Sequence, residues 1–329
     1  MFGGKDMGIR TLYKPEVFQG NMNKKNYFEG YFFKLVSKNA EEIISIIPGI
    51  SLDEEDPHAF IQVLRNSDGK SYYIRYPLKE FSYNKNVLFL QIGENIFTQS
   101  YIRFNITEDN LNICGIVWFD NLQTVDNKIL RPGIMGPFRF FPFMECYHGI
   151  VSMNHNLKGT VSINHEPINF TGGKGYIEKD WGTNFPEAYV WIQSNNFVDP
   201  NLSVMISIAR IPFMKRHFRG FLACISIEDK TRIFTTYTGA KIKQFTVKGD
   251  ELYIEIKQGK ERIEISMSKS LGRELVAPQK GAMKRAVHES LESTMELKIY
   301  YKERLMTHQY TSIAAIELSG DIALITKSK

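Results

Sequence analysis

The sequence contains only three cysteines among its 329 residues, Cys114, Cys146 and Cys224. Their wide spacing and odd number argue against a disulfide framework or a Cys-x-x-Cys motif. The seven histidines form no metal-ligand pattern such as His-Glu-x-x-His. The chain also lacks a Gly-x-Ser-x-Gly nucleophile motif, and Gly172–Gly175 lacks the spacing of a phosphate-binding loop. These absences disfavour a metalloenzyme, a serine hydrolase and a nucleotide-binding protein, and we expect no cofactor and no metal.

Long apolar runs and long runs of like charge are also missing. No apolar run approaches the ~18 residues of a membrane-spanning helix, and the N-terminus shows no hydrophobic signal segment. The net charge of 41 − 36 = +5 is spread along the chain without a basic tail, so nucleic acid is not an expected partner. We expect a cytoplasmic protein, and its weak positive charge is compatible with peripheral contact with an anionic membrane.

Helical periodicity is scarce, whereas short extended segments are abundant. Aromatic residues make up 13% of the chain, a composition that favours strands. The extended segments recur at short, even intervals and are separated by turns such as Asn66–Gly69, which is typical of antiparallel barrels or sandwiches. Because single cores stop growing near ~250–300 residues, the length is compatible with two domains or one large β unit. The second half repeats the spacing of the first, so we expect two stacked barrels, residues 1–165 and 166–329. Residues 1–25 read as a polar arm, and Gly281–Leu291 is the best helix candidate.

The first predicted strand, Tyr27–Lys34, places a carboxyl group among aromatic rings. Period-two alternation puts Glu29 on the same face as Tyr27, Tyr31 and Phe33. Burial there would favour the neutral carboxyl, with shifts of up to ~3–5 pKa units in extreme cases. The alternative is that Glu29 pairs with a lysine or arginine across the sheet.

The stretch from Gly172 to Phe197 mixes aromatic and polar residues in two strands. In the first strand one face carries Tyr176, Glu178 and Asp180, and the opposite face carries Ile177, Lys179 and Trp181. In the second strand the shared face is formed by Trp191, Gln193, Asn195 and Phe197. Such faces suit the wall of a cavity for an apolar ligand with a few polar atoms. The alternative is a barrel strand whose polar groups bond to backbone or meet water, and Lys179 is expected to pair with a carboxylate.

Residues 131–148, RPGIMGPFRFFPFMECYH, differ from the rest of the chain. Three prolines prevent a regular strand, yet Phe138, Phe140, Phe141 and Phe143 cluster there. An irregular apolar segment can plug a barrel, line a ligand entrance or enter lipid, and we expect plugging or lining. The polar residues Glu145, Tyr147 and His148 follow directly.

Several segments together resemble the tocopherol cyclase family. YFEGYFFK at Tyr27–Lys34 is similar to the family's FEGWYxK opening, and Gly175–Phe197 is close to its signature GYxEKNWGxxFPxxWxWxQxNxF. The segments Pro132–Ser152, Leu275–Leu291 and Ala315–Gly320 also fit. Asp180 departs from the pattern, which has Asn there, and Tyr189 stands where Trp is frequent. Both departures indicate a different substrate.

The resemblance implies an all-β fold of two lipocalin-like antiparallel β-barrel domains with one short helix near the C-terminus, related to carotenoid hydratases. It implies a cofactor-free, acid-catalysed cyclisation, in which a phenol adds to the double bond of a prenyl chain. This chemistry needs a proton donor, aromatic faces that stabilise a carbocation, and an amide that orients the phenol. The candidate catalytic acids are Asp180, Glu178, Glu29 and Glu145. The candidate ligand-binding residues are Tyr31, Tyr147, His148, Tyr176, Trp191, Gln193, Asn195 and Phe197.

Two other functions use the same residues. A lipocalin-like protein can bind a prenylated quinol, a lipid or a pigment without reaction, and a solid interior would favour a structural or interaction protein. A carboxyl buried without a basic partner favours catalysis, whereas a carboxyl paired with lysine or arginine favours binding or structure.

Overall fold

The computed structural model describes residues 11–213, 216–228 and 230–327, so the first ten residues of the predicted arm 1–25 lie outside the described part. The chain forms two compact units, Met1–Phe185 with Leu275–Arg285 and Pro186–Glu274 with Ala286–Lys329. The chain leaves the first unit between Phe185 and Pro186, later than the 165/166 boundary expected from the sequence. The reason is that strand β13 (Lys174–Gly182) pairs with strands of the first unit.

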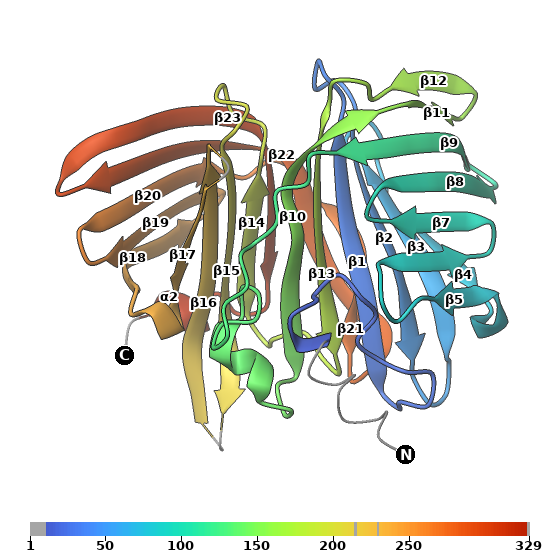
Figure 1. Ribbon diagram of the computed structural model, residues 1–329, viewed down its shortest axis with the longest axis horizontal. Helices are drawn as coiled ribbons and strands as arrows, with labels where there is room; N and C mark the ends of the chain where they lie inside the picture. Colours follow the sequence, from blue (N-terminus) through green and yellow to red (C-terminus); the bar gives the residue numbers. More distant parts are fainter. Residues whose placement is uncertain (1–10, 214–215, 229, 328–329) are drawn as a thin grey trace. The chain divides into compact units, whose positions relative to one another are not determined.

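The strands between residues 27 and 182 form one antiparallel sheet in the first unit. In chain order they are β1 (Tyr27–Val36), β2 (Ile43–Leu52), β3 (His58–Arg65), β4 (Tyr72–Tyr76), β5 (Phe81–Tyr83), β6 (Phe89–Ile92), β7 (Asn95–Thr98), β8 (Tyr101–Glu108), β9 (Leu111–Asp120), β10 (Cys146–Lys158), β11 (Thr160–Ile163), β12 (Glu166–Asn169) and β13. The main path runs β4-β3-β2-β1-β13-β10-β9-β8-β7-β6-β5, so β13 is the fifth of eleven strands and lies between β1 and β10 (Figure 1).

The first sheet curls back on itself. Its two edge strands, β4 and β5, are consecutive in the chain and are joined by residues 77–80, which include the short 3-10 helix η1 (Leu78–Glu80). Eleven strands in a flat sheet would place the edges roughly 48 Å apart. Four connecting residues reach about 14 Å at most. The edges must therefore approach each other, which gives the lipocalin-like curvature visible in Figure 1.

Apolar side chains fill the concave side of this sheet. Phe33 on β1 packs against Phe97 on β7 and Phe119 on β9, with ring centroids 5.8 and 6.2 Å apart. Ile177 and Trp181 of β13 belong to the same buried cluster. Alternation along β13 thus directs one set of side chains into the core and the other set to the opposite face.

The second unit repeats the construction with a second antiparallel sheet. The strands of this sheet are β14 (Tyr189–Ser194), β15 (Ser203–Phe213), β16 (Arg216–Ile227), β17 (Lys230–Thr235), β18 (Lys241–Lys248), β19 (Glu251–Gln258), β20 (Glu261–Ser268), β21 (Arg273–Gln279), β22 (Ala282–Tyr301) and β23 (Arg304–Ser319). Most of β21 and the first residues of β22 fall within Leu275–Arg285, which belongs to the first unit. The path is β17-β16-β15-β14-β23-β22-β20-β19-β18, with β21 paired to β22. Its edge strands β17 and β18 are again consecutive and joined by residues 236–240, so this sheet curls as well.

The helix predicted at Gly281–Leu291 is wrong. Residues 282–291 belong to the long strand β22, and His288, Glu289 and Ser290 pair with Leu318, Glu317 and Ile316 of β23. Alanine, methionine, lysine and glutamate favour helices locally, but the strand ladder overrides this weak preference. The short helix near the C-terminus is α2 (Ala323–Thr326), whose Ile325 is buried in the core of the second unit.

Candidate functional site

Strand β13 separates two kinds of chemistry on its two faces. Lys179 lies between Ile177 and Trp181 on the face that packs into the core of the first unit. Glu178 lies on the opposite face together with Asp180. Alternation predicted this division. The structure adds what each face contacts.

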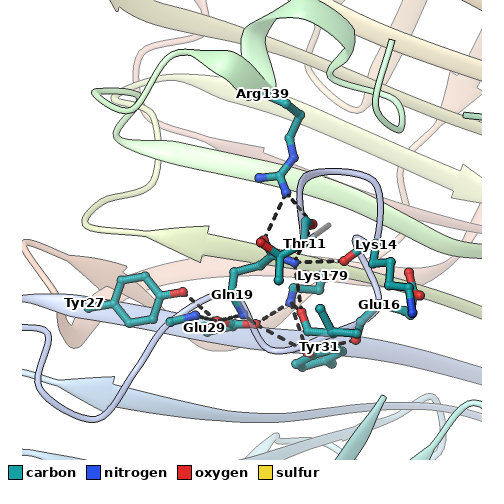
Figure 2. Close-up of polar contacts among 11 residues, drawn as sticks. Thr11, Lys14, Glu16, Gln19, Tyr27, Glu29, Tyr31, Arg139 and Lys179 are labelled. Atoms are coloured by element: carbon teal, nitrogen blue, oxygen red, sulfur yellow. Dashed lines mark hydrogen bonds and ion pairs between the residues drawn. The ribbon is translucent and has the colours of Figure 1, made fainter. Parts of the chain in front are cut away.

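Glu29 is a buried carboxylate whose oxygens are fully occupied. It forms an ion pair with Lys179, and both side chains are completely buried. Its oxygens accept hydrogen bonds from the Tyr27 hydroxyl at 2.5 Å and the Tyr31 hydroxyl at 3.3 Å. The backbone N–H of Gln19 donates to both oxygens at 2.9 and 3.0 Å (Figure 2). These partners give the Glu29 carboxylate a structural role. The structure thus contains the alternative named from the sequence, in which Glu29 pairs with a lysine across the sheet.

The same network fastens the segment of residues 11–20, which we call the N-terminal strap. Lys179 donates to the carbonyl oxygen of Val17 at 2.7 Å, and Glu29 also accepts from the N–H of Gly20 at 3.0 Å. Burial lowers the pKa of Lys179 to about 8, although Glu29 opposes this shift. Desolvation is thus the main cost of placing an ammonium group here, and the ion pair offsets part of it.

Arg139, which the sequence did not single out, completes the fastening of the strap. It lies in the short 3-10 helix η2 (Gly136–Phe140) and is only 7% exposed. Its guanidinium donates to the carbonyl oxygen of Thr11 at 3.2 Å and to Gln19 Oε1 at 3.0 Å (Figure 2). It also lies over the Trp181 ring, 4.6 Å from the centroid. Burial lowers its pKa to about 10. A lone arginine in an irregular, phenylalanine-rich segment gives no sequence signal for this role.

The opposite face of β13 carries a polar cluster of His148, Glu178 and Asp180. The β10–β13 register places His148 directly opposite Asp180. His148 Nδ1 lies 3.0 Å from Asp180 Oδ1, and His148 Nε2 lies 3.4 Å from Glu178 Oε2. Nε2 is buried and has no aligned hydrogen-bond partner among the described residues. The imidazole therefore bridges two carboxylates, one at each ring nitrogen.

The charges in this cluster favour a protonated imidazole. Burial alone would lower the pKa of His148, but the carboxylates of Glu178 and Asp180 raise it to about 9. The side chain of Glu178 is 5% exposed, that of His148 10% and that of Asp180 27%. The cluster therefore runs from a carboxylate near solvent, through a charged ring, to a buried carboxylate. This graded burial is suited to passing a proton between water and a dry site.

Two neighbours complete the polar cluster. The hydroxyl of Tyr176, which is fully buried, donates to Glu178. Cys146 Sγ lies 3.8 Å from Asp180 Oδ1, and burial together with Asp180 raises the pKa of this thiol well above its usual value. The thiol is thus a weak donor to Asp180 and not a nucleophile. Cys146 was missed because an isolated cysteine carries no signal without the strand register.

The polar cluster is also the place where a cation could bind in the described part of the chain. One ligand atom from each of His148, Glu178 and Asp180 lies within 4.8 Å of the others. The two carboxylates, however, face different nitrogens of one ring, and a single imidazole directs only one nitrogen at a given ion. This arrangement fits a shared proton better than a chelated metal.

The other candidate residues of the first unit lie outside the polar cluster. Glu145 is exposed, so its carboxyl lacks the dry surroundings of a buried acid. Tyr147 stacks on Trp181 with centroids 5.6 Å apart and donates to the carbonyl oxygen of Phe141. Tyr31 is buried in the core, where its one hydroxyl proton is shared between Glu29 and the carbonyl oxygen of Glu16, which lies 3.1 Å away.

The remaining candidates lie in the second unit. Trp191 and Gln193 are buried on β14, on the face opposite the core residues Val190 and Ile192. Gln193 Nε2 donates to Asn195 Oδ1 at 3.3 Å. Phe197 does not share their face, contrary to prediction, and packs into the core of the second unit. The reason is that β14 ends at Ser194, where the alternation stops.

The Glu29–Lys179 pair gives a first prediction. Glu29→Gln or Lys179→Met alone leaves one charge buried without its partner, which costs about 3–5 kcal/mol of the free energy of unfolding. The double variant should lose clearly less than the sum of the two, as measured by urea denaturation at pH 7. As a control, the corresponding substitutions Lys25→Met and Glu54→Gln in the exposed Lys25–Glu54 pair should leave the urea concentration at half-unfolding unchanged. If the double variant loses as much free energy of unfolding as the two single variants together, Glu29 and Lys179 do not stabilise each other, and the prediction is contradicted.

Comparison with known proteins identifies a family for this chain. The family model described as tocopherol cyclase-like matches residues 126–320, more than half of the chain. A probable chloroplastic tocopherol cyclase of Oryza sativa subsp. japonica is 28% identical over 103 residues, which span 30% of this chain and only 22% of that protein.

Solved structures support the architecture. Kievitone hydratase from Nectria haematococca has a TM-score of 0.51 at 12% identity, over 89% of each chain. CghA has a TM-score of 0.55 at 9% identity, over 92% of this chain and 90% of its own. At these identities the likeness shows the fold alone. From the match of the family model, the chain belongs to the tocopherol cyclase-like family.

Proposed function

We propose that the polar cluster of His148, Glu178 and Asp180 is a proton-delivery site for cofactor-free addition to the double bond of an apolar prenyl or quinol-type ligand. The observation that supports this proposal is the imidazole held between two carboxylates of graded exposure. Asp180, the most exposed group, exchanges protons with water. His148 relays them, and Glu178, at the buried end, is the donor to the ligand.

The proposed reaction conserves protons and electrons. Glu178 takes the Nε2 proton of the charged His148 ring and passes it to one alkene carbon, so that a C–H bond forms, the π bond breaks and a tertiary carbocation results. A phenol oxygen of the same ligand then bonds to the cation and loses its proton, which returns to the cluster. The product is an isomer of the substrate. Tyr176, whose hydroxyl donates to Glu178, positions that carboxyl.

Variants of the cluster test this function with a prenylated quinol as substrate. Glu178→Gln and His148→Gln should each lower the rate of chromanol formation by about 10²–10⁴-fold, the usual contribution of a general acid. Asp180→Asn should also lower it, while the exposed Glu145→Gln serves as the matched control. In D₂O one deuterium should appear at the new C–H bond. Because His148 loses its proton as the pH rises through about 9, the rate should fall above that pH.

Two outcomes would contradict this function. Full activity of Glu178→Gln and His148→Gln, with the fold intact, would remove the cluster from the mechanism. Saturable ligand binding without product in the wild-type protein would leave the non-catalytic binding function. Activity that is abolished by a chelator and restored by a divalent ion would assign the cluster to a metal.

We also propose that the first unit contacts a membrane surface, from which an apolar ligand would be taken. The sequence predicts that the phenylalanines plug a barrel or line a ligand entrance. Phe140, Phe141 and Phe143 are 45%, 37% and 60% exposed, which does not fit a buried plug, while a lining role stays a prediction. Ile129 and Leu130 are 84% and 76% exposed at the tip of a tight turn closed by Lys128 and Arg131. An apolar tip with cations at its base suits an anionic bilayer. No helix among the described residues has the length and apolar character needed to cross a membrane.

Vesicle sedimentation tests this contact. The wild-type protein should pellet with phosphatidylglycerol vesicles more than with phosphatidylcholine vesicles, and Leu130→Ser should reduce the pelleted fraction several-fold because the tip loses apolar area. Leu271→Ser, which removes an equally exposed leucine of the second unit, is the control. Equal pelleting of the two variants would contradict a specific role for the tip.

A further inference from the structure

Lys34, near the end of β1, is a fully buried lysine that neither the core nor the proposed mechanism has so far explained. Its exposed fraction is 0%. Phe33 and Leu35, on either side of it, belong to the buried core of the first unit, so alternation places Lys34 on the opposite face of β1. Lysine is among the residues least often buried completely, because its charged form loses hydration there. The position of this ammonium group therefore needs a physical reason.

The sheet register places Lys34 on the face of the first sheet that carries the polar cluster. Lys34 lies directly opposite Tyr176 of β13, and Phe32 lies opposite Glu178. Glu178 is thus the diagonal neighbour of Lys34 across the two strands. Such neighbours in an antiparallel pair lie roughly 7–8 Å apart, a separation that a long side chain can span. The position between them along β13 is that of Tyr176, whose hydroxyl donates to Glu178.

Among the described positions next to Lys34 on this face, Glu178 is the one acid. On β2 the register places Ser45 opposite Lys34, and Ser45 is also fully buried. The remaining neighbours on the face are Phe32, Val36, Ile43, Ile47, Tyr176 and Lys174. Charges in such surroundings are screened by salt and water much less than charges at the surface. On this face of the sheet, the carboxylate on which the Lys34 charge acts is that of Glu178.

The charge of the polar cluster also calls for a further cation. With its imidazole protonated, the cluster holds one positive charge on His148 and two negative charges on Glu178 and Asp180. The ammonium group of Lys34 makes the count two positive and two negative. A buried site without net charge avoids the cost of an unbalanced ion in dry surroundings. The ionisable groups nearest to Glu178 on this face are Lys34 from β1, Tyr176 and Asp180 from β13, and Cys146 and His148 from β10.

Lys34 acts through its charge, because its buried side chain offers no surface to a ligand. A nearby cation favours the ionised form of a carboxyl group. Only an ionised Glu178 can take the Nε2 proton of His148, which lies 3.4 Å away. A carboxyl group that is made more acidic in this way is also a stronger proton donor to an alkene.

We propose that Lys34 is a positioning residue of the proton-delivery site, whose ammonium group balances the charge of the cluster and keeps Glu178 ionised, so that the mobile proton rests on His148 before it is transferred. The effect of Lys34 on the reaction rate rests on the proposed function. Its effect on Glu178 is a property of the protein without a ligand and is measured separately.

An NMR titration of protein labelled with ¹³C-glutamate tests the effect on Glu178, with Glu178→Gln used to assign its carboxyl signal. The wild-type signal should be that of a carboxylate at pH 7. Lys34→Met should move the titration to higher pH by roughly one unit, the effect expected of one charge at the diagonal spacing. Lys34→Arg, which keeps the charge, should restore the wild-type curve.

Lys174→Met is the matched control for this titration. Lys174 lies on the same face of β13, four residues and about 14 Å from Glu178, and its Nζ bonds to Asn156 Oδ1 at 3.0 Å. It should leave the Glu178 titration unchanged. A Glu178 that is protonated at pH 7 in the wild-type protein, or that titrates identically in Lys34→Met, would overturn the proposal. The wild-type measurement needs no variant, and Lys34→Gln replaces Lys34→Met if the latter does not fold.

Kinetics with a prenylated quinol separate this role from the proton-delivery function. Lys34→Met should lower kcat several-fold and leave KM unchanged, because Lys34 does not touch the ligand, and Lys34→Arg should restore kcat. An unchanged Glu178 titration in Lys34→Met would overturn the role of Lys34 and leave the proton-delivery function standing. Full activity of Glu178→Gln would overturn that function, while a shifted Glu178 titration would still support the effect of the Lys34 charge.

Discussion

The first unit depends on one strand whose two faces hold opposite charges in dry surroundings. On β13, Lys179 points into the core toward Glu29, while Glu178 and Asp180 on the other face hold His148. A slip of one residue in the pairing of β13 would exchange the two faces and bury each charge against a partner of the wrong sign. The register with β1 and β10 is therefore strongly specified, and the candidate site and the core are set by the same constraint.

The Glu29–Lys179 pair also connects the core to the N-terminal strap. Its bonds to the strap go through backbone groups, namely the N–H of Gln19 and Gly20 and the carbonyl oxygen of Val17. Contacts of this kind do not depend on the strap's side chains, so the strap is held by its conformation. Arg139 adds a buried cation that is satisfied by carbonyl oxygens and the Trp181 ring. Two buried cations beside one carboxylate are tolerated because each has hydrogen-bond acceptors.

Local patterns predicted the faces of the strands but not the contacts across them. Alternation was enough to group Glu29 with Tyr27 and Tyr31, and Glu178 with Asp180. It could not place His148 opposite Asp180, because that pairing depends on the β10–β13 register, which β-bulges interrupt after Ile150. It failed at Phe197, where the strand had already ended, and residue propensity failed along β22, where ladder pairing with β23 decides the structure. The fold class was within reach of the sequence, whereas the partners of each buried charge required the tertiary structure.

The account as a whole rests on a protonated imidazole between Glu178 and Asp180. The most direct measurement is an NMR titration of the His148 ring in ¹⁵N-histidine-labelled protein, with His148→Gln used to assign its signals. The account predicts that both ring nitrogens keep their protons at pH 7 and that the ring titrates near pH 9. A ring that is neutral at pH 7, or that titrates near the ordinary histidine value of about 6.5, would contradict it.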